Sequence, residues 1–299
     1  MILIAGSTGL LGAEICRRLA AKGKDVRALV RTTSDAARRA QLKEWGCELV
    51  EGDLKNADSL AAACRGVRTV ISTVSSTFSR REGDSNQSVD RDGQLRLVDA
   101  AVRAGVRQFI YISFPPTPAF PNDLDDAKRS VERHLRESGL NWTSLQAGYF
   151  MEIWLGPAVG FDYAGRTARL YGEGVGKNSW ISYVDVARFA VACVDNPAAR
   201  NRTIPIGGPE ALSPLEVVRL FEERSGSPFQ VEKVPVAALQ QQWEGAPDPL
   251  SRSFASLMLT YAHGWRMEME AVCRELGVTG LTRVDEYADR LIGKNLVAG

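Results

Sequence analysis

The chain has 299 residues, of which 44% are hydrophobic and 24% charged, proportions typical of a globular protein with one large domain or a domain and a smaller lobe. This composition excludes a disordered chain and a fibrous repeat. Lys and Arg number 37 against 36 Asp and Glu, so the sequence lacks the basic excess that covers nucleic-acid phosphates. We therefore expect a small-molecule substrate and no nucleic-acid partner.

The five cysteines are widely spaced and form no CxxC motif, so a disulfide framework is not expected. With two histidines and no HExxH motif, the sequence predicts no metal site. The chain starts Met1-Ile2-Leu3-Ile4-Ala5 and reaches glycine at once, with no charged leader, and no apolar run is long enough to cross a bilayer. We expect a cytoplasmic protein without a membrane partner.

Through the first half, short runs rich in Ile, Val and Leu alternate with longer helical stretches, a pattern typical of a parallel sheet with crossover helices. The predicted strands are Ile2–Ala5, Val26–Val30, Cys47–Glu51, Thr69–Thr73 and Gln108–Ser113. The predicted helices between them are Leu11–Lys22, Ala36–Trp45, Asp58–Cys64 and Gln94–Ala104. Five β-α units in succession predict an α/β fold with a doubly wound parallel sheet.

A helix at Asp125–Ser138 and a strand at Thr143–Ala147 extend the sheet, and Thr203–Ile206 adds an edge strand. We assign residues 1–150 to the sheet domain, to which a segment near 182–207 returns. Residues 151–299 form mainly a smaller C-terminal substrate lobe, rich in Gly and Pro, with helices at Ser213–Ser225 and Val236–Trp243. We expect this lobe over the carboxyl edge of the sheet, where open α/β sheets bind ligands.

A glycine-rich turn follows the first strand directly and runs into a helix. It comprises Gly6, Ser7, Thr8, Gly9, Leu10, Leu11 and Gly12. Glycines at these points permit a tight turn and a close approach of the backbone to a pyrophosphate, which the helix N-terminus then faces. The turn predicts that residues 1–150 form a Rossmann-type NAD(P)-binding domain; an ordinary βα turn is the alternative.

The end of the second strand, about twenty residues further on, usually carries an acid in NAD-specific sites. This chain has Arg31 followed by Thr32 and Thr33, and we expect that no carboxylate opposes the guanidinium. Because a guanidinium pairs with a 2′-phosphate, Arg31 predicts NADP(H) as cofactor, with NADPH preferred over NADH. A solvated arginine at a strand end is the alternative.

Further cofactor contacts are expected after the third and fourth strands. Asp53, followed by Leu54, is predicted to accept a hydrogen bond from the adenine amino group or to cap the turn after it. Ser72, Thr73 and Val74 end the fourth strand with small side chains that would lie along the cofactor.

Together these residues resemble the short-chain dehydrogenase/reductase superfamily, specifically its atypical NmrA-like branch, which includes isoflavone-reductase-like enzymes, quinone reductases and triphenylmethane-dye reductases. The resemblance covers roughly the first 200 residues. It is carried by the glycine turn with Arg31, by Lys128-Arg129-Ser130-Val131-Glu132, by Ser138-Gly139-Leu140-Asn141-Trp142-Thr143, by Gly148-Tyr149-Phe150-Met151 and by Tyr183-Val184-Asp185-Val186-Ala187. It implies a monomer or a homodimer.

Typical members of the superfamily carry a Tyr four residues before a Lys, and a Ser on the preceding strand, so that the phenol protonates the substrate. Ser113 and Lys128 are present here, but Leu124 takes the position of the tyrosine. The resemblance implies that Lys128 binds the nicotinamide ribose and assists proton delivery; an exposed lysine in a charged helix is the alternative.

Tyr149 and Phe150 follow the sixth strand, where the family's residues wall the nicotinamide and the substrate. Aromatic faces there suit a flat, conjugated acceptor, and core packing is the alternative. Four tryptophans of the second half are expected either to wall such a pocket or to fill it: Trp154, Trp180, Trp243 and Trp265. Asp185 is expected to cap the helix after it.

Two functions remain open. The first is an NADPH-dependent oxidoreductase that passes hydride to a small aromatic, quinone-like or conjugated acceptor, with Lys128 and Tyr149 as catalytic residues. The second is an NADP(H)-binding redox sensor, regulator or assembly factor without turnover, which would bind a protein partner. Leu124 favours the second. The two differ in whether the lobe after Gly148 leaves a cavity beside the nicotinamide. A nucleotide-sugar epimerase or dehydratase ranks lower, because those relatives need the tyrosine.

Overall fold

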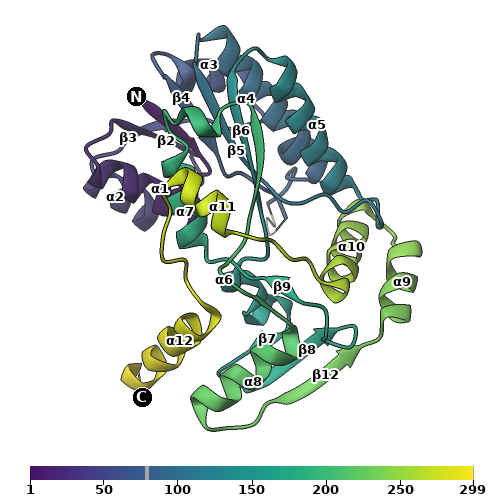
Figure 1. Ribbon diagram of the computed structural model, residues 1–299. Helices are drawn as coiled ribbons and strands as arrows, with labels where there is room; N and C mark the ends of the chain where they lie inside the picture. The colour runs from purple at the N-terminus through teal and green to yellow at the C-terminus, as the bar shows by residue number, and fades with distance from the viewer. Residues whose placement is uncertain (78–80, 299) are drawn as a thin grey trace.

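The computed structural model describes residues 1–77 and 81–298 and contains a seven-stranded parallel sheet (Figure 1). The strand order is β10-β6-β5-β4-β1-β2-β3. The strands are β1 (Ile2–Ala5), β2 (Val26–Val30), β3 (Glu48–Glu51), β4 (Thr69–Ser72), β5 (Gln108–Ser113), β6 (Asn141–Ala147) and β10 (Arg202–Ile206). The order reverses direction between β1 and β4, so the crevice of a doubly wound fold opens there. The predicted fold class is confirmed.

Helices cover both faces of the sheet (Figure 1). One face carries α1 (Leu10–Ala21), α2 (Ala36–Glu44), α7 (Tyr183–Ala192) and α11 (Glu270–Leu276); the other carries α3 (Ala57–Cys64), α4 (Asp92–Arg103) and α5 (Asp123–Glu137). In β1, Ile2 and Ile4 pack into the first layer, whereas Leu3 and Ala5 pack into the second. A strand buried on both faces is continuously apolar, which is why the sequence shows these strands as unbroken hydrophobic runs.

The entry to α4 differs from the prediction. A π-helix, η1 (Asn86–Arg91), precedes α4, which begins at Asp92 instead of Gln94. Ser85 caps η1 in a capping box with Ser88. The π-helix could not be predicted from the sequence, because the polar run Asn86-Gln87-Ser88 has no helical hydrophobic periodicity. The other helices and strands predicted for the sheet domain end within two residues of the observed limits.

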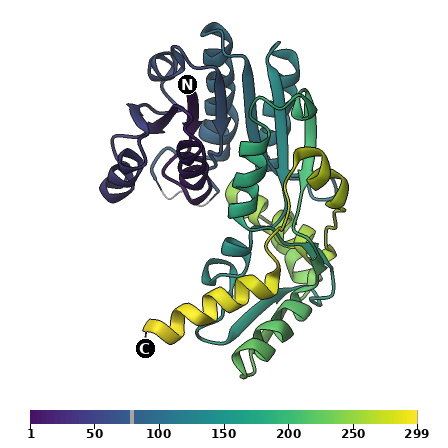
Figure 2. The same cartoon turned by 60° about the vertical axis from the view of Figure 1, so that its left-hand side comes forward.

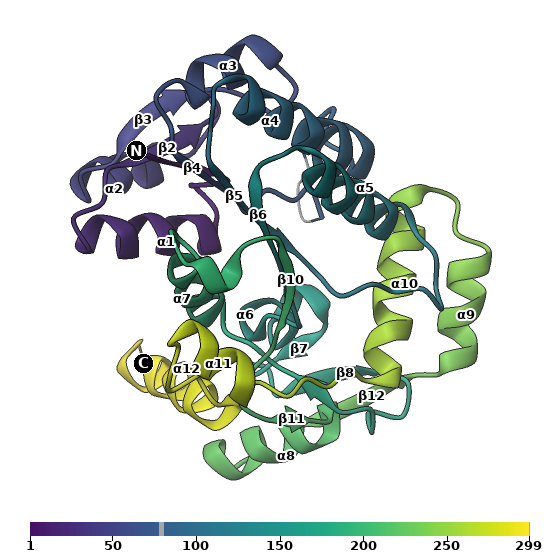
Figure 3. The ribbon, with the colours of Figure 1, turned by 45° about the horizontal axis from the view of Figure 1, so that its top comes forward.

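The lobe lies below the carboxyl edge of the sheet (Figures 1 and 2). Its short sheets are β7-β8-β12 (Phe161–Asp162, Thr167–Tyr171, Gln230–Val234) and β9-β11 (Asn178–Ser179, Ala211–Leu212). Its helices are α6 (Met151–Trp154), α8 (Pro214–Ser225), α9 (Val236–Glu244), α10 (Pro249–His263) and α12 (Val284–Ala298), and a 3₁₀ turn spans Pro157–Val159. They enclose a separate core around Trp180, Phe221 and Leu259. In addition, α10 packs against α5 of the sheet domain (Figure 3).

The second half of the chain contributes to both parts. The segment expected to return to the sheet includes α7, the 3₁₀ turn Pro197–Ala199 and β10, and α11 also packs into the first core layer. Asp185 was expected as the cap of α7, and this expectation is wrong. Ser182 caps the helix, because its backbone is extended and its hydroxyl accepts from Val184 N at 3.2 Å. Asp185 lies buried in the first turn, where its carboxylate accepts from Arg188 and from Thr282 N.

Across residues 1–77 and 81–298, every helix is too short or too polar to reach from one side of a membrane to the other.

The contact between the glycine turn and α1 gives a first prediction. A Cβ on Gly12 would lie far inside van der Waals distance of the Gly6 carbonyl oxygen, whereas a Cβ on Gly9 would meet that oxygen at 3.4 Å. We expect Gly12→Ala to lower the free energy of unfolding by about 3 kcal/mol, because backbone atoms cannot yield easily. Gly9→Ala should cost under about 1 kcal/mol. Urea titration followed by circular dichroism measures both; equal losses would contradict the close contact.

Candidate functional site

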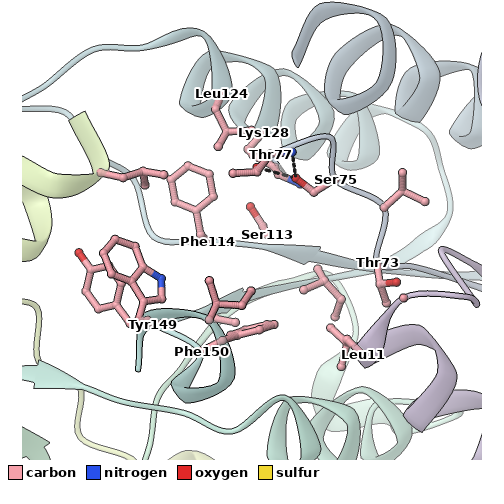
Figure 4. Close-up of a pocket in the computed structure, with 18 of the residues that line it drawn as sticks. Leu11, Thr73, Ser75, Thr77, Ser113, Phe114, Leu124, Lys128, Tyr149 and Phe150 are labelled. Carbon is pink, nitrogen blue, oxygen red and sulfur yellow. Dashed lines mark hydrogen bonds between the residues drawn. The ribbon is translucent and has the colours of Figure 1, made fainter. Parts of the chain in front are cut away.

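A cleft of about 680 Å³ opens where the strand order reverses and continues to the lobe (Figure 4). The structure brings thirteen of the predicted site residues into its lining: Gly6, Thr8, Gly9, Leu10, Leu11, Gly12, Arg31, Thr73, Val74, Ser113, Lys128, Tyr149 and Phe150. Thr32 and Asp53 line a second hollow beside it. Residues far apart in the sequence therefore share one site.

The glycine turn forms one end of the cleft. Gly6 has a φ of +83°, which glycine adopts without strain, and Gly9 N donates to the Gly6 carbonyl oxygen at 3.0 Å. Helix α1 then starts at Leu10 with no side-chain cap and no acidic residue in its first turn. Its first N–H groups and its positive dipole end therefore suit an anion such as a pyrophosphate.

Three predicted cofactor residues, Ser7, Leu54 and Ser72, lie outside the cleft lining. Ser7 Oγ donates to the Leu29 carbonyl at 2.8 Å, which fastens the turn to β2. Ser72 Oγ donates to Gln94 Oε1 at 2.9 Å within the layer of α4. Leu54 packs into the hydrophobic core of that same layer. These side chains are buried, and they support the site through packing and hydrogen bonds within the protein.

Lys128 lines the middle of the cleft from α5, and its side chain is only 5% exposed. Its Nζ lies 3.4 Å from Asp90 Oδ1 and 5.1 Å from the centre of the Tyr111 ring. Burial lowers the pKa of Lys128, while the charge of Asp90 acts in the opposite direction. The alternative of an exposed lysine is therefore excluded.

Asp90 is a functional candidate that the sequence prediction did not include. It lies in the π-helix η1 and is completely buried. Its Oδ2 accepts from Ser76 N at 2.8 Å and from Ser76 Oγ at 2.5 Å. Within the described residues, Oδ1 has no hydrogen-bond partner and lies 3.4 Å from Lys128 Nζ. π-Helical turns often occur at functional sites, but no hydrophobic period reveals one in a sequence.

The position of the missing tyrosine is occupied as the sequence predicts. Leu124 lies one helical turn before Lys128 on α5 and lines the cleft, so no phenol stands there (Figure 4). Ser113 is present at the end of β5, but its hydroxyl accepts from Arg129 Nη2 at 3.1 Å. Arg129 also donates to the Phe114 carbonyl at 2.6 Å. The Ser-Tyr-Lys proton relay is therefore absent from this cleft.

The lobe end of the cleft is apolar and aromatic. Tyr149 lies edge-on to Trp154 with ring centres 4.6 Å apart, and Trp154 stacks on Tyr261 at 4.9 Å. Burial raises the pKa of Tyr149, so its phenol stays protonated and is a weak acid. Trp154 and Trp265 line the cleft, whereas Trp180 lies in the lobe core and Trp243 outside the lining. Helix α10, which the sequence analysis did not predict, adds Phe254, Leu257, Met258 and Thr260 to this wall.

The prediction that no carboxylate opposes Arg31 is wrong. Arg31 Nη1 donates to Asp84 Oδ2 at 2.9 Å, and Lys55 Nζ donates to Asp84 Oδ1 at 2.8 Å. Asp84 is 53 positions away, on the segment after β4, so inspection of the strand ends could not find it. Asp53 Oδ1 accepts from Lys55 N at 2.8 Å, as expected if Asp53 caps the turn after it. Asp53 also lines the second hollow.

In the part of the chain that the structure describes, no three His, Cys, Asp or Glu side chains gather where they could hold a metal ion.

Comparison with known proteins identifies the family of this chain. The NmrA-like family matches residues 1–288, and the chain belongs to this family. The photosystem II assembly factor Ycf39 of Synechocystis is 31% identical over 80% of this chain and 72% of its own. The NAD(P)H azoreductase of Xenophilus azovorans is 31% identical over 84% of this chain and 83% of its own. The Citrobacter triphenylmethane reductase, solved with NADP(H), superposes with a TM-score of 0.77 at 18% identity, covering 98% and 100% of the two chains, and shares the fold.

The buried charge pair gives the second prediction. Removing either partner leaves the other charge buried, so Asp90→Asn and Lys128→Met should each lower the free energy of unfolding by about 3 kcal/mol. The double variant should lose less than the sum by at least about 1 kcal/mol. Guanidinium titrations of all four proteins measure this coupling. Additive losses would show that the two side chains do not interact.

Proposed function

We propose that this protein is an NADPH-dependent reductase that passes hydride to a small, flat, conjugated acceptor such as a quinone or an azo dye. The observation that carries the proposal is the continuity of the cleft. A single hollow of about 680 Å³ runs from the glycine turn, past Lys128, to a wall of aromatic side chains. A dinucleotide at the turn and a planar acceptor against the aromatic wall would therefore share one space.

The residues present fit a nicotinamide dinucleotide. Gly12 packs too closely on Gly6 for any side chain, and the uncapped start of α1 offers N–H groups to a pyrophosphate. Thr73 and Val74 would lie along the cofactor, and Lys128 would donate to the nicotinamide ribose. The bound cofactor supplies the hydride. The names of two relatives support this choice: one is an NAD(P)H azoreductase, and the other is a triphenylmethane reductase solved with NADP(H).

The acceptor class is inferred from what the lobe end offers. Among the described residues of the cleft lining, Arg31, Arg81 and Lys128 are charged, and none of the three belongs to the aromatic wall. An uncharged, planar acceptor would stack on these side chains without losing solvation of a charge. Since Leu124 cannot donate a proton, the acceptor has to spread the negative charge that hydride transfer creates. Quinones and azo dyes do so, and water or Lys128 can then protonate them.

In this mechanism the protein orients the reactants. Phe150 and Leu11 would flank the nicotinamide end, while Phe114 and Trp154 hold the acceptor. Lys128, positioned by Asp90, presents an ammonium to the ribose and to the charge that develops on the acceptor. Tyr149, whose pKa burial raises, would contribute a ring face and a neutral hydroxyl rather than a strong acid.

The second candidate is a cofactor-binding assembly factor or sensor without turnover. It is favoured by Leu124 and by the 31% identity to a protein named as a photosystem II assembly factor. The open aromatic end of the cleft weighs against it, because a protein that only binds the cofactor has no need of space beside the nicotinamide.

Five free cysteines are consistent with the cytoplasm, which we propose as the compartment.

Oxidation of NADPH by the purified protein tests the proposal directly. Uncharged quinones, an azo dye and a triphenylmethane dye are supplied in turn, NADH is run in parallel, and absorbance at the reduced nicotinamide band is followed. We expect turnover with at least one acceptor, faster with NADPH. Tight NADPH binding with no oxidation across the set would favour the assembly-factor function.

Lys128→Met should reduce turnover roughly 10- to 100-fold, since it removes the ammonium that Lys128 presents in the middle of the cleft and keeps most of the side-chain length. Lys43→Ala, an exposed lysine on α2, is the matched control and should retain full activity. Circular dichroism confirms that each protein is folded during the assay. An unchanged rate for Lys128→Met would remove Lys128 from the mechanism.

Arg31→Ala should weaken NADPH binding by about 1.5–3 kcal/mol and NADH binding much less, because only NADPH carries the 2′-phosphate. Dissociation constants from nicotinamide fluorescence at fixed ionic strength give both values. Equal losses for the two cofactors would remove Arg31 from the phosphate site.

A further inference from the structure

We infer that Asp84 sets the discrimination between NADPH and NADH, because its carboxylate holds the two cations that a 2′-phosphate would need. The inference rests on the proposed function, since it presumes that a nicotinamide dinucleotide binds at the glycine turn. Asp84 uses one oxygen for each cation: Oδ2 for Arg31 at 2.9 Å and Oδ1 for Lys55 at 2.8 Å. Its own side chain is 2% exposed, against 37% for Arg31 and 35% for Lys55.

The location of Asp84, Arg31 and Lys55 fits the 2′ side of an adenosine ribose. Arg31 and Arg81 line both the main cleft and the second hollow, so the two spaces adjoin at these residues. The second hollow, of about 760 Å³, lies beside the ends of β2 and β3, one strand beyond the glycine turn. An adenosine ribose that leaves the turn toward β2 would direct its 2′ substituent at Arg31.

The charge balance of the second hollow does not favour a phosphate. Among the residues that the structure describes, its lining contains three cations, Arg31, Lys55 and Arg81, and four acids, Glu51, Asp53, Glu82 and Asp84. Arginine at the end of β2 therefore does not by itself create a positive site. A doubly charged phosphate beside Arg31 would meet the carboxylate of Asp84, and its approach requires Arg31 and Lys55 to exchange that partner for the phosphate.

Local structure holds Asp84 in this place from both sides. Its backbone N–H donates to the Arg81 carbonyl at 3.1 Å, and the next residue, Ser85, caps the π-helix η1. The carboxylate is consequently fixed by the chain as well as by its ion pairs. NADH, whose ribose has a 2′-hydroxyl, avoids the repulsion and can donate a hydrogen bond to a carboxylate. Asp84 therefore weakens the binding of NADPH more than the binding of NADH. It reduces the preference for NADPH that Arg31 alone would give.

Asp84→Asn tests the inference through binding alone. Dissociation constants for NADPH and NADH are measured by nicotinamide fluorescence at fixed ionic strength, without any acceptor. We expect NADPH to bind at least fivefold more tightly than to the unmodified protein, with NADH changed less than twofold. Arg31 and Lys55 are each about one-third exposed and can hydrate once the carboxylate is gone, so the variant should fold.

Glu82→Gln is the matched control, since Glu82 is an exposed acid two positions away that lines the same hollow. It removes the same charge without touching either ion pair of Asp84, so the ratio of the two constants should change less than twofold. Lys55→Gln gives a second measurement: it should weaken NADPH binding more in the Asp84→Asn background than in the unmodified protein, because Asp84 no longer competes for Lys55.

An unchanged or weaker NADPH affinity in Asp84→Asn would overturn the inference, because Asp84 would then be neutral or would orient the cations for the phosphate. An equal effect of Glu82→Gln would overturn it as well, since general charge would explain the result. Failure of the unmodified protein to bind either cofactor would overturn the proposed function along with it. The separate outcomes distinguish the two proposals.

Discussion

The whole site depends on the close approach of Gly12 to the Gly6 carbonyl. Since no side chain fits between them, α1 can pack closely on the turn that follows β1 and point its free N–H groups into the crevice. Ser7 fastens the turn to β2, and Thr73 Oγ1 reaches the Ala5 carbonyl at 3.2 Å from the end of β4. Three neighbouring strands therefore meet at one point, and the cleft takes its position from that junction.

One segment of the chain controls the charge at two points of the cleft. Between Arg81 and Asp92 the chain forms a turn, a serine cap and the π-helix η1. Asp84 at its start holds Arg31 and Lys55, and Asp90 near its end faces Lys128. A buried or half-buried cation needs a partner, and in both places this segment provides a carboxylate. A single segment, residues 81–92, therefore positions the cationic groups that we propose contact the cofactor.

The lobe determines what can stand beside the cofactor. Helix α10 packs against α5, and its Phe254 and Met258 line the cleft together with Phe114. Leu124 contributes one more apolar side chain where typical relatives of the superfamily carry a phenol. An acceptor that delocalises the negative charge created by hydride transfer matches a wall of this kind. A simple carbonyl acceptor would need an acid to protonate its oxygen, and this wall provides none. The apolar wall and the missing tyrosine therefore favour the same class of acceptor.

The sequence by itself determined the architecture of the sheet and the location of the turn. Continuous apolar runs such as Ile2–Ala5 indicate strands buried on both faces, and glycine spacing reveals the turn, because both signals act between neighbouring residues. The same reasoning placed Arg31, Ser113, Lys128 and Tyr149 at the cleft, and it identified Leu124. Tertiary structure alone decided the partners: Asp84 lies 53 positions from Arg31, and Asp90 lies 38 from Lys128. It also decided that Ser7, Leu54 and Ser72 face the core, and that α10 completes the wall. Ion pairs and cavity walls depend on which surfaces packing brings together, and no local pattern records that choice.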